Sequence, residues 1–122
     1  MKPQVKEKWL NALRSGEYQQ GKHSLRVENN FCCLGVLTDL YVQENSDGCW
    51  VEAGHNYGFR DNHRDDNFYD MEYLPEMVVN WAGLEDENPT VRIADSYYEV
   101  ISNLNDTDYT FARIADIIEE QL

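Results

Sequence analysis

The acidic charge of this chain is concentrated in one part of the sequence. Its 122 residues include 23 acidic and ten basic residues, a formal net charge of −13 at pH 7. Residues 1–26 contain six of the basic residues and only two acids, a local balance of +4, so the remainder of the chain carries −17. A folded domain with such a field repels nucleic acids and anionic membranes, and it attracts cations and basic surfaces.

The composition is nevertheless that of a folded protein. Hydrophobic residues make up 42% of the chain, including three Trp, eight Tyr and four Phe, which is enough for one compact core in a single domain of residues 1–122. No apolar run approaches the roughly 20 residues that span a bilayer, and the first residues lack the apolar stretch of a signal peptide. The three cysteines, two of them adjacent, do not make a disulfide framework. We therefore expect a protein of the reducing cytoplasm without membrane association.

Helical signals appear in five segments of differing length, from which we expect about four helices packed with the strands. Residues 3–15 place Val5, Trp9 and Leu13 on one helical face, with Pro3 in the first turn. Helical spacing recurs in residues 34–42, in residues 74–81 and in residues 96–104. Thr110 is a candidate N-cap for a last helix.

The strand signals are shorter than the helical ones. Residues 24–28 alternate between apolar and polar side chains, Asn29-Asn30 suits a tight turn, and residues 31–33 would return as the second strand of a hairpin. Residues 49–51 and 90–93 predict further short strands. Residues 53–70 show no sustained period and are rich in Gly, Asn and Asp, which predicts a long irregular acidic loop. The predicted fold class is α+β, with a short hairpin and minor strands packed against the helices.

Two stretches of the chain carry distinctive motifs. The first runs from Trp9-Leu-Asn-Ala-Leu-Arg-Ser-Gly to Phe31-Cys-Cys-Leu-Gly-Val-Leu, and the second includes Leu104-Asn-Asp and Phe111-Ala-Arg-Ile-Ala-Asp. In these motifs the chain resembles a family of small proteins encoded in bacteriophage and prophage genomes. The resemblance implies a phage accessory protein that acts in the cytoplasm of a bacterial host, and it assigns no catalytic or binding residue.

The acidic part of the chain is the first candidate functional region. Five aromatic residues lie among the acids between positions 57 and 73 and are candidate anchors for a partner protein. An array of carboxylates can occupy a site that binds phosphates. We therefore favour a non-enzymatic protein that binds and modulates a host protein with a basic surface, one that acts in defence or in nucleic-acid handling. The candidate partner-binding residues are Asp61, Asp65, Asp66, Tyr69, Asp70 and Glu72.

A small-molecule site is the alternative. The N-terminal half combines basic and aromatic residues that would suit a ligand such as a nucleotide signal, which the protein would sequester. The same basic residues would equally serve to pair with the protein's own acids. The candidate ligand-binding residues are Arg14, Tyr18, Gln19, Lys22 and Arg26.

A third class is a cysteine-dependent enzyme. Cys32 and Cys33 stand at a predicted helix N-terminus, where the pKa of a thiol is lowered, and one of the three histidines would serve as the base. Their apolar neighbours Phe31 and Leu34 favour instead two small core residues.

Two further patterns have weaker support. The spacing from Asp61 to Glu72 imitates a calcium loop, but Asp66 stands where glycine would make the sharp turn, so we expect no metal and no cofactor. The last two helices have the outline of a helix-turn-helix. Residues 105–122 carry five acids against Arg113 alone, which argues against a DNA reader because the phosphates would be repelled. The oligomeric state stays open, and a homodimer would bury part of the aromatic surplus.

Overall fold

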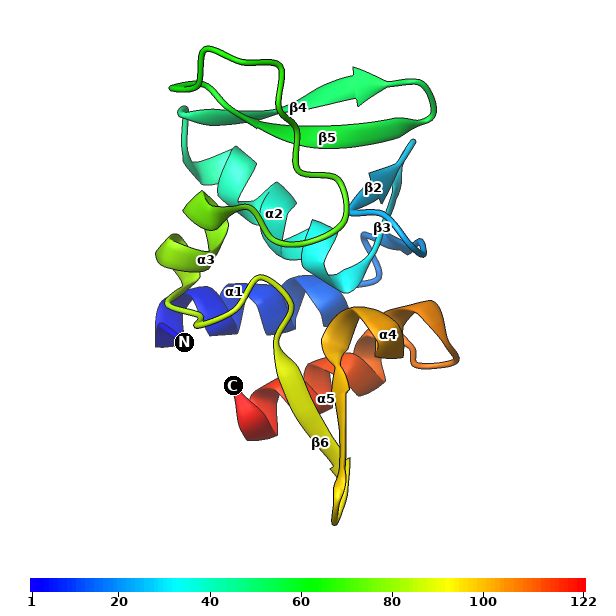
Figure 1. The fold of residues 1–122 in the computed structure, drawn as a ribbon. Helices are drawn as coiled ribbons and strands as arrows, with labels where there is room; N and C mark the ends of the chain where they lie inside the picture. The colour runs from blue at the N-terminus through cyan, green and yellow to red at the C-terminus, as the bar shows by residue number, and fades with distance from the viewer.

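Five helices and two small sheets make up the structure, a computed structural model that describes residues 1–122 (Figure 1). The helices are α1 (Pro3–Arg14), α2 (Cys33–Glu44), α3 (Glu76–Ala82), α4 (Ile101–Asp106) and α5 (Phe111–Gln121). The strands of the larger sheet are β1 (Gln19–Gln20), β2 (Arg26–Val27), β3 (Asn30–Phe31), β4 (Gly48–Ala53) and β5 (Asn56–Asp61). β6 (Thr90–Ala94) and β7 (Tyr97–Val100) form a separate hairpin. The predicted α+β class is confirmed, with five helices where about four were expected.

The elements are arranged in layers. The larger sheet has the order β1-β3-β2-β5-β4, and all of its neighbouring strands are antiparallel except β1 and β3. Figure 1 shows α2 between this sheet and α1, and α5 on the far side of α1. The β6–β7 hairpin projects from the end of the molecule opposite to β4 and β5. None of the five helices is long and apolar enough to cross a membrane.

The core forms where α1, α2 and α5 meet. Trp9, Leu37 and Ile114 are completely buried, and the indole Nε1 of Trp9 donates a hydrogen bond to the Cys33 carbonyl at 2.9 Å. Burial of each side chain of this size stabilises the fold by about 1.5–3 kcal/mol. Gly35 lets α2 approach the neighbouring chain, because a Cβ there would lie 1.8 Å from the carbonyl oxygen of Leu25.

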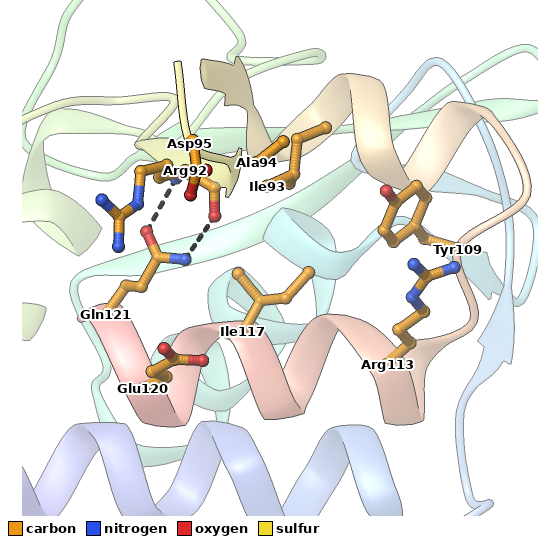
Figure 2. Close-up of a pocket in the computed structure, with 9 residues that line it drawn as sticks. All are labelled: Arg92, Ile93, Ala94, Asp95, Tyr109, Arg113, Ile117, Glu120 and Gln121. Carbon is orange, nitrogen blue, oxygen red and sulfur yellow. Dashed lines mark hydrogen bonds between the residues drawn. The ribbon is translucent and has the colours of Figure 1, made fainter. Parts of the chain in front are cut away.

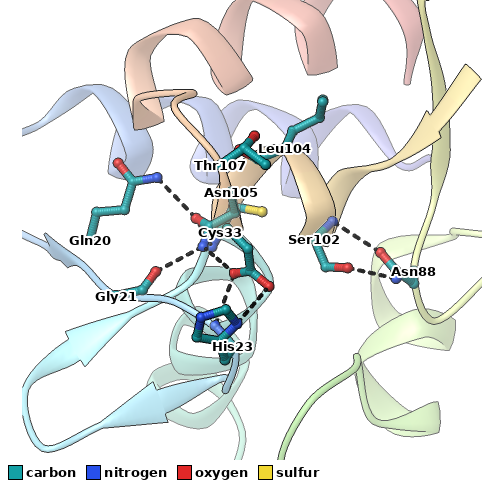
Figure 3. A network of polar contacts seen from close by, with 10 residues as sticks. Gln20, Gly21, His23, Cys33, Asn88, Ser102, Leu104, Asn105 and Thr107 are labelled. Atoms are coloured by element: carbon teal, nitrogen blue, oxygen red, sulfur yellow. Dashed lines mark hydrogen bonds and ion pairs between the residues drawn. The ribbon is translucent and has the colours of Figure 1, made fainter. Parts of the chain in front are cut away.

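Buried Asn105, on α4, connects three separate segments (Figure 3). Its Oδ1 accepts hydrogen bonds from the backbone N–H of Cys33 at 3.0 Å and from Nε2 of Gln20 at 3.1 Å. Its Nδ2 donates to the Gly21 carbonyl at 2.8 Å. The Asn105 amide thus provides an acceptor for a free backbone N–H group at the N-terminus of α2. It also connects this end of α2 to the strand β1 and to α4.

Most of the elements expected from the sequence are present. The helix over residues 3–15 is confirmed as α1, and those over 34–42 and 74–81 are confirmed within one to two residues as α2 and α3. Thr110 caps α5, since its side chain accepts a hydrogen bond from the Arg113 N–H. The first hairpin is confirmed, but its turn lies one residue earlier than predicted, because Val27 already pairs with Asn30.

Two predictions are wrong. The irregular loop over residues 53–70 begins only at residue 62, because Ala53 ends β4 and residues 56–61 form β5, joined by a turn in which Gly54 has a φ of +69°. The helix predicted over residues 96–104 is wrong in its first half, which is a strand in the structure. Residues 97–100 pair with β6 across a turn at Asp95 and Ser96, and the helix begins at Ile101.

Candidate functional site

The largest cavity of the molecule lies beside α3 and is strongly acidic. It has a volume of about 550 Å³, and Leu74, Val79 and Phe68 supply its apolar lining. A narrower pocket of about 210 Å³ shares Phe68 and Asp70 with it. We call the two together the acidic groove. The carboxylates that line the acidic groove belong to Asp61, Asp70, Glu76, Glu85, Asp86 and Glu87.

The fold brings these acids together from separate stretches of the chain. Gly83 ends α3 in the left-handed conformation, with a φ of +70°, and the chain then turns back along the helix. The backbone N–H of Leu74 donates to the Glu87 carbonyl at 3.0 Å, which holds the acidic loop beside the start of α3. Asp70 is fixed to β5 by two backbone hydrogen bonds with Phe59, at 2.8 and 3.0 Å.

The acidic groove concentrates negative charge with little compensation. Burial raises the pKa of the half-buried Asp70 carboxyl; Arg64 opposes this rise and the Glu87 carboxylate adds to it. Arg64 is the one cationic residue in the lining. Its guanidinium forms two hydrogen bonds with Asp66, at 3.0 and 2.7 Å, and lies 4.5 Å from the ring centre of Phe68. This pairing lowers the pKa of Asp66. A cation that entered the acidic groove would therefore meet several carboxylates without a partner.

Of the six residues that the sequence suggested for partner binding, the structure places two in the lining of the acidic groove. Asp61 and Asp70 line the acidic groove. Asp66 lies in the same segment but is engaged by Arg64, and Asp65 is exposed and outside the lining.

The other two predicted residues lie elsewhere. Tyr69 is half-buried and outside the lining, and Glu72 lines a separate pocket of about 170 Å³. The residues missing from the prediction are Glu76 and the run 85–87. Three consecutive acids just after a glycine-terminated helix were visible in the sequence, but only the fold places them opposite Asp70.

The suggested N-terminal ligand site is not assembled. Arg14 pairs with Asp116 at 2.8 Å and with Glu119 at 3.2 Å, so α1 binds the acids of α5. The guanidinium of Arg26 stands 3.9 Å over the ring centre of Tyr57. Arg14 therefore forms ion pairs with the protein's own acids. Cavities lie beside α3, beside Cys32, beside α5 and at the chain termini, and none of these is lined by Arg14, Tyr18, Gln19, Lys22 or Arg26.

The two adjacent cysteines are core residues. Cys32 is the N-cap of α2 and its sulfur accepts a hydrogen bond from the Gly35 N–H, but burial raises the pKa of the thiol to about 11. Burial raises the pKa of the Cys33 thiol well above its ordinary value. His23 lines the same small pocket as Cys32, and its Nδ1 lies 3.4 Å from a carboxylate oxygen of Asp106. His23 and Cys32 thus line one pocket, but the burial of Cys32 opposes the thiolate that a nucleophile requires.

The remaining sequence patterns acquire no site in the structure. No group of three or more His, Cys, Asp or Glu side chains is arranged to hold a metal ion. Helices α4 and α5 form a hairpin whose second helix packs on α1 and buries Phe111, Ile114 and Ile118 in the core.

One family model matches the whole chain, residues 1–122. The chain belongs to the family described as Domain of unknown function (DUF8296). No curated protein and no solved structure matches it. The family match covers both the motif-bearing ends and the acidic segment between them, so the acidic groove lies within the family domain.

Proposed function

We propose that this protein is a phage accessory protein that binds and modulates a basic host protein through its acidic groove, without catalysing a reaction. The observation that carries the proposal is the convergence of six carboxylates around one exposed aromatic ring. The six come from three stretches of the chain, residues 61–70, α3 and residues 85–87. Carboxylates scattered for solubility would not be expected to gather in the largest concavity of the molecule.

The acidic groove has the features of a protein-binding surface. Phe68, 49% exposed, lines both of its pockets, whereas Tyr73, 41% exposed, lines the separate pocket that contains Glu72. Aromatic anchors that fill a pocket on a partner carry much of the binding free energy at interfaces. The surrounding carboxylates would accelerate association with a basic surface and fix its orientation.

The arrangement of charge supports the proposal for the kind of partner. A surface that binds nucleic acid presents arginine and lysine to phosphates, and carboxylates spaced along a groove can engage the same cations. This favours a nucleic-acid-handling or defence protein of the bacterial host as the partner. The resemblance to phage and prophage proteins supplies the biological setting for such a contact.

The test compares two variants of equal charge. The first carries Glu85→Gln, Asp86→Asn and Glu87→Gln, which removes three carboxylates from the acidic groove. The matched control carries Glu17→Gln, Glu52→Gln and Asp108→Asn, three exposed acids outside it. Each protein is used to capture partners from bacterial lysate at low salt, and the captured protein is then purified and its affinity measured pairwise.

We expect the groove variant to bind the purified partner at least tenfold more weakly, and the control to bind as the unmodified protein does. Affinity should also fall with rising salt, because the exposed charges are screened within about 10 Å at 0.1 M ionic strength. Competition by double-stranded DNA for the partner would support its nucleic-acid-binding nature. Equal losses in the two variants, or recovery of no basic protein, would refute the proposal.

A further inference from the structure

Arg64 is the cationic residue of the acidic groove, and its contacts show how the groove holds a guanidinium group. The residue belongs to the loop between β5 and α3, and its side chain is 45% exposed. The guanidinium donates two hydrogen bonds to Asp66, at 3.0 and 2.7 Å, and lies 4.5 Å from the ring centre of Phe68. A long side chain on an exposed loop can extend into water. This one instead lines both pockets of the groove, where it contacts an aromatic ring and a carboxylate together.

No other arginine of the protein combines these two contacts. Arg14 pairs with two carboxylates but stacks on no ring, and Arg26 lies over Tyr57 without an ion pair. Arg113 lies 4.2 Å over the ring centre of Tyr109, at one end of the groove between β6 and α5 (Figure 2), and it also has no ion pair. A guanidinium held by both an aromatic ring and a carboxylate is therefore specific to the acidic groove.

The acidic groove has further carboxylates that are available to a guanidinium. The six in its lining form no ion pair within 4.0 Å. The hydrogen bonds with Asp66 raise the pKa of Arg64, and the carboxylates of Asp61 and Asp70 add to this rise, so both lie close enough to act on its charge. One arginine cannot pair with all six. A partner that brings additional guanidinium groups would find carboxylates free to accept paired N–H···O bonds.

These contacts favour arginine over lysine. A guanidinium is planar, so it stacks on an aromatic ring while its edge N–H groups bind a carboxylate. The ammonium of lysine is a compact, strongly hydrated charge without this geometry. The pair of Arg64 and Asp66 is exposed, and exposed ion pairs contribute little to stability. A guanidinium from a partner can therefore replace Arg64 at a small cost in free energy.

We propose that the acidic groove binds arginine side chains of its partner, and that Arg64 occupies one of their positions in the free protein. A partner arginine replaces Arg64 on the ring of Phe68 and pairs with Asp66. Further arginines pair with the carboxylates of Glu76 and residues 85–87. This inference rests on the proposed function, because it names the chemistry by which the same groove recognises a basic protein.

The experiment is calorimetric titration of the full chain with hexa-arginine and with hexa-lysine, each acetylated and amidated at its ends. The peptides have equal length and charge, so general electrostatic attraction acts equally on both. Arg64→Lys keeps the charge of residue 64 and loses the planar guanidinium. Its matched control is Arg60→Lys, at a position on β5 that has no ion pair and lies outside the lining. Phe68→Ala removes the ring, and its control is Tyr73→Ala, an aromatic residue of similar exposure outside the acidic groove.

We expect hexa-arginine to bind the unmodified protein at least fivefold more tightly than hexa-lysine. Arg64→Lys should bind hexa-arginine at least twofold more tightly than the unmodified protein does, because the side chain to be displaced is held more weakly. Arg60→Lys should leave this affinity unchanged. Phe68→Ala should reduce the preference for hexa-arginine below twofold, and Tyr73→Ala should preserve it. Far-UV circular dichroism verifies that each variant is folded.

Equal affinities for the two peptides, or equal affinities of Arg64→Lys and Arg60→Lys for hexa-arginine, would overturn the inference. Absence of binding of both peptides at millimolar concentration would do the same. Failure of the proposed function is a separate result, because it is measured with the captured host protein and with the variant that lacks the carboxylates of residues 85–87. A groove that binds this partner without distinguishing the two peptides would leave the proposed function standing and refute only the recognition of arginine.

Discussion

Replacement of Asn105 by alanine tests how the fold is held together at the junction of α2, α4 and β1. The side chain is fully buried and satisfies the backbone N–H of Cys33, the carbonyl of Gly21 and the side chain of Gln20 (Figure 3). Each buried polar group left without a partner costs about 1–3 kcal/mol. Because two backbone groups lose their partner, we expect a destabilisation of about 2–6 kcal/mol, a large part of the roughly 5–15 kcal/mol that is typical of a domain.

Urea denaturation followed by tryptophan fluorescence measures this free energy of unfolding directly. For a domain of this length, a loss of 1 kcal/mol lowers the melting temperature by about 3–5 °C, so we expect a decrease of roughly 6–30 °C. The matched control is Asn103→Ala, on an exposed position of the same helix, where a change below about 0.5 kcal/mol is expected. A loss under 1 kcal/mol for Asn105→Ala, or one equal to that of the control, would refute the reasoning.

Two other predictions concern titratable groups. Because burial raises the pKa of Asp70 in the folded protein, its ionised carboxyl is less favourable folded than unfolded, and its contribution to stability decreases as the pH rises through these pKa values. Asp70→Asn should therefore raise the melting temperature at pH 7 and leave it unchanged near pH 3, and a lower melting temperature at pH 7 would contradict this. Of the three thiols, we expect only the partly exposed Cys49 to react with a thiol reagent at pH 8 in the folded protein, and all three in urea; rapid reaction of Cys32 in the folded state would restore the cysteine-enzyme hypothesis.

The helices were predictable where local signals agreed with the tertiary environment. In α1, Pro3 at the first position and the buried stripe of Val5, Trp9 and Leu13 match the observed helix. In α5, the cap residue Thr110 and a buried face at helical spacing act together. Each of these segments packs one face on the core, so periodicity and burial give the same answer.

The wrong predictions share a physical cause. Helical spacing relates four apolar residues of this segment, Tyr97, Val100, Ile101 and Leu104. The backbone of Tyr97 nevertheless pairs with β6 across the turn at residues 95–96, and its side chain is 54% exposed. Pairing with a distant strand overrode the local period. In residues 56–61 the frequent Gly, Asn and Asp concealed a strand that cross-strand pairing with β4 makes stable.

The acidic groove could be predicted only in part for a related reason. The density of acids around residue 65 pointed to the correct region, yet Asp65 lies outside the lining, and Asp66 is engaged by Arg64. What completes the groove is the approach of residues 85–87, which depends on the reversal at Gly83 and on the bond from Leu74 to Glu87. The long sequence separation between these residues concealed this contact.

The net charge of −13 is therefore a poor measure of how the protein would meet a partner. Part of the negative charge is compensated by ion pairs within the molecule. Arg14 of α1 pairs with Asp116 and Glu119 of α5, and Lys8 pairs with Glu44. The carboxylates of the acidic groove have only Arg64 among them. A partner that responded only to overall charge would not distinguish the carboxylates of the acidic groove from acids elsewhere on the surface. A partner that fits the acidic groove would distinguish them. Equal-charge variants inside and outside it consequently separate specific recognition from general electrostatic attraction.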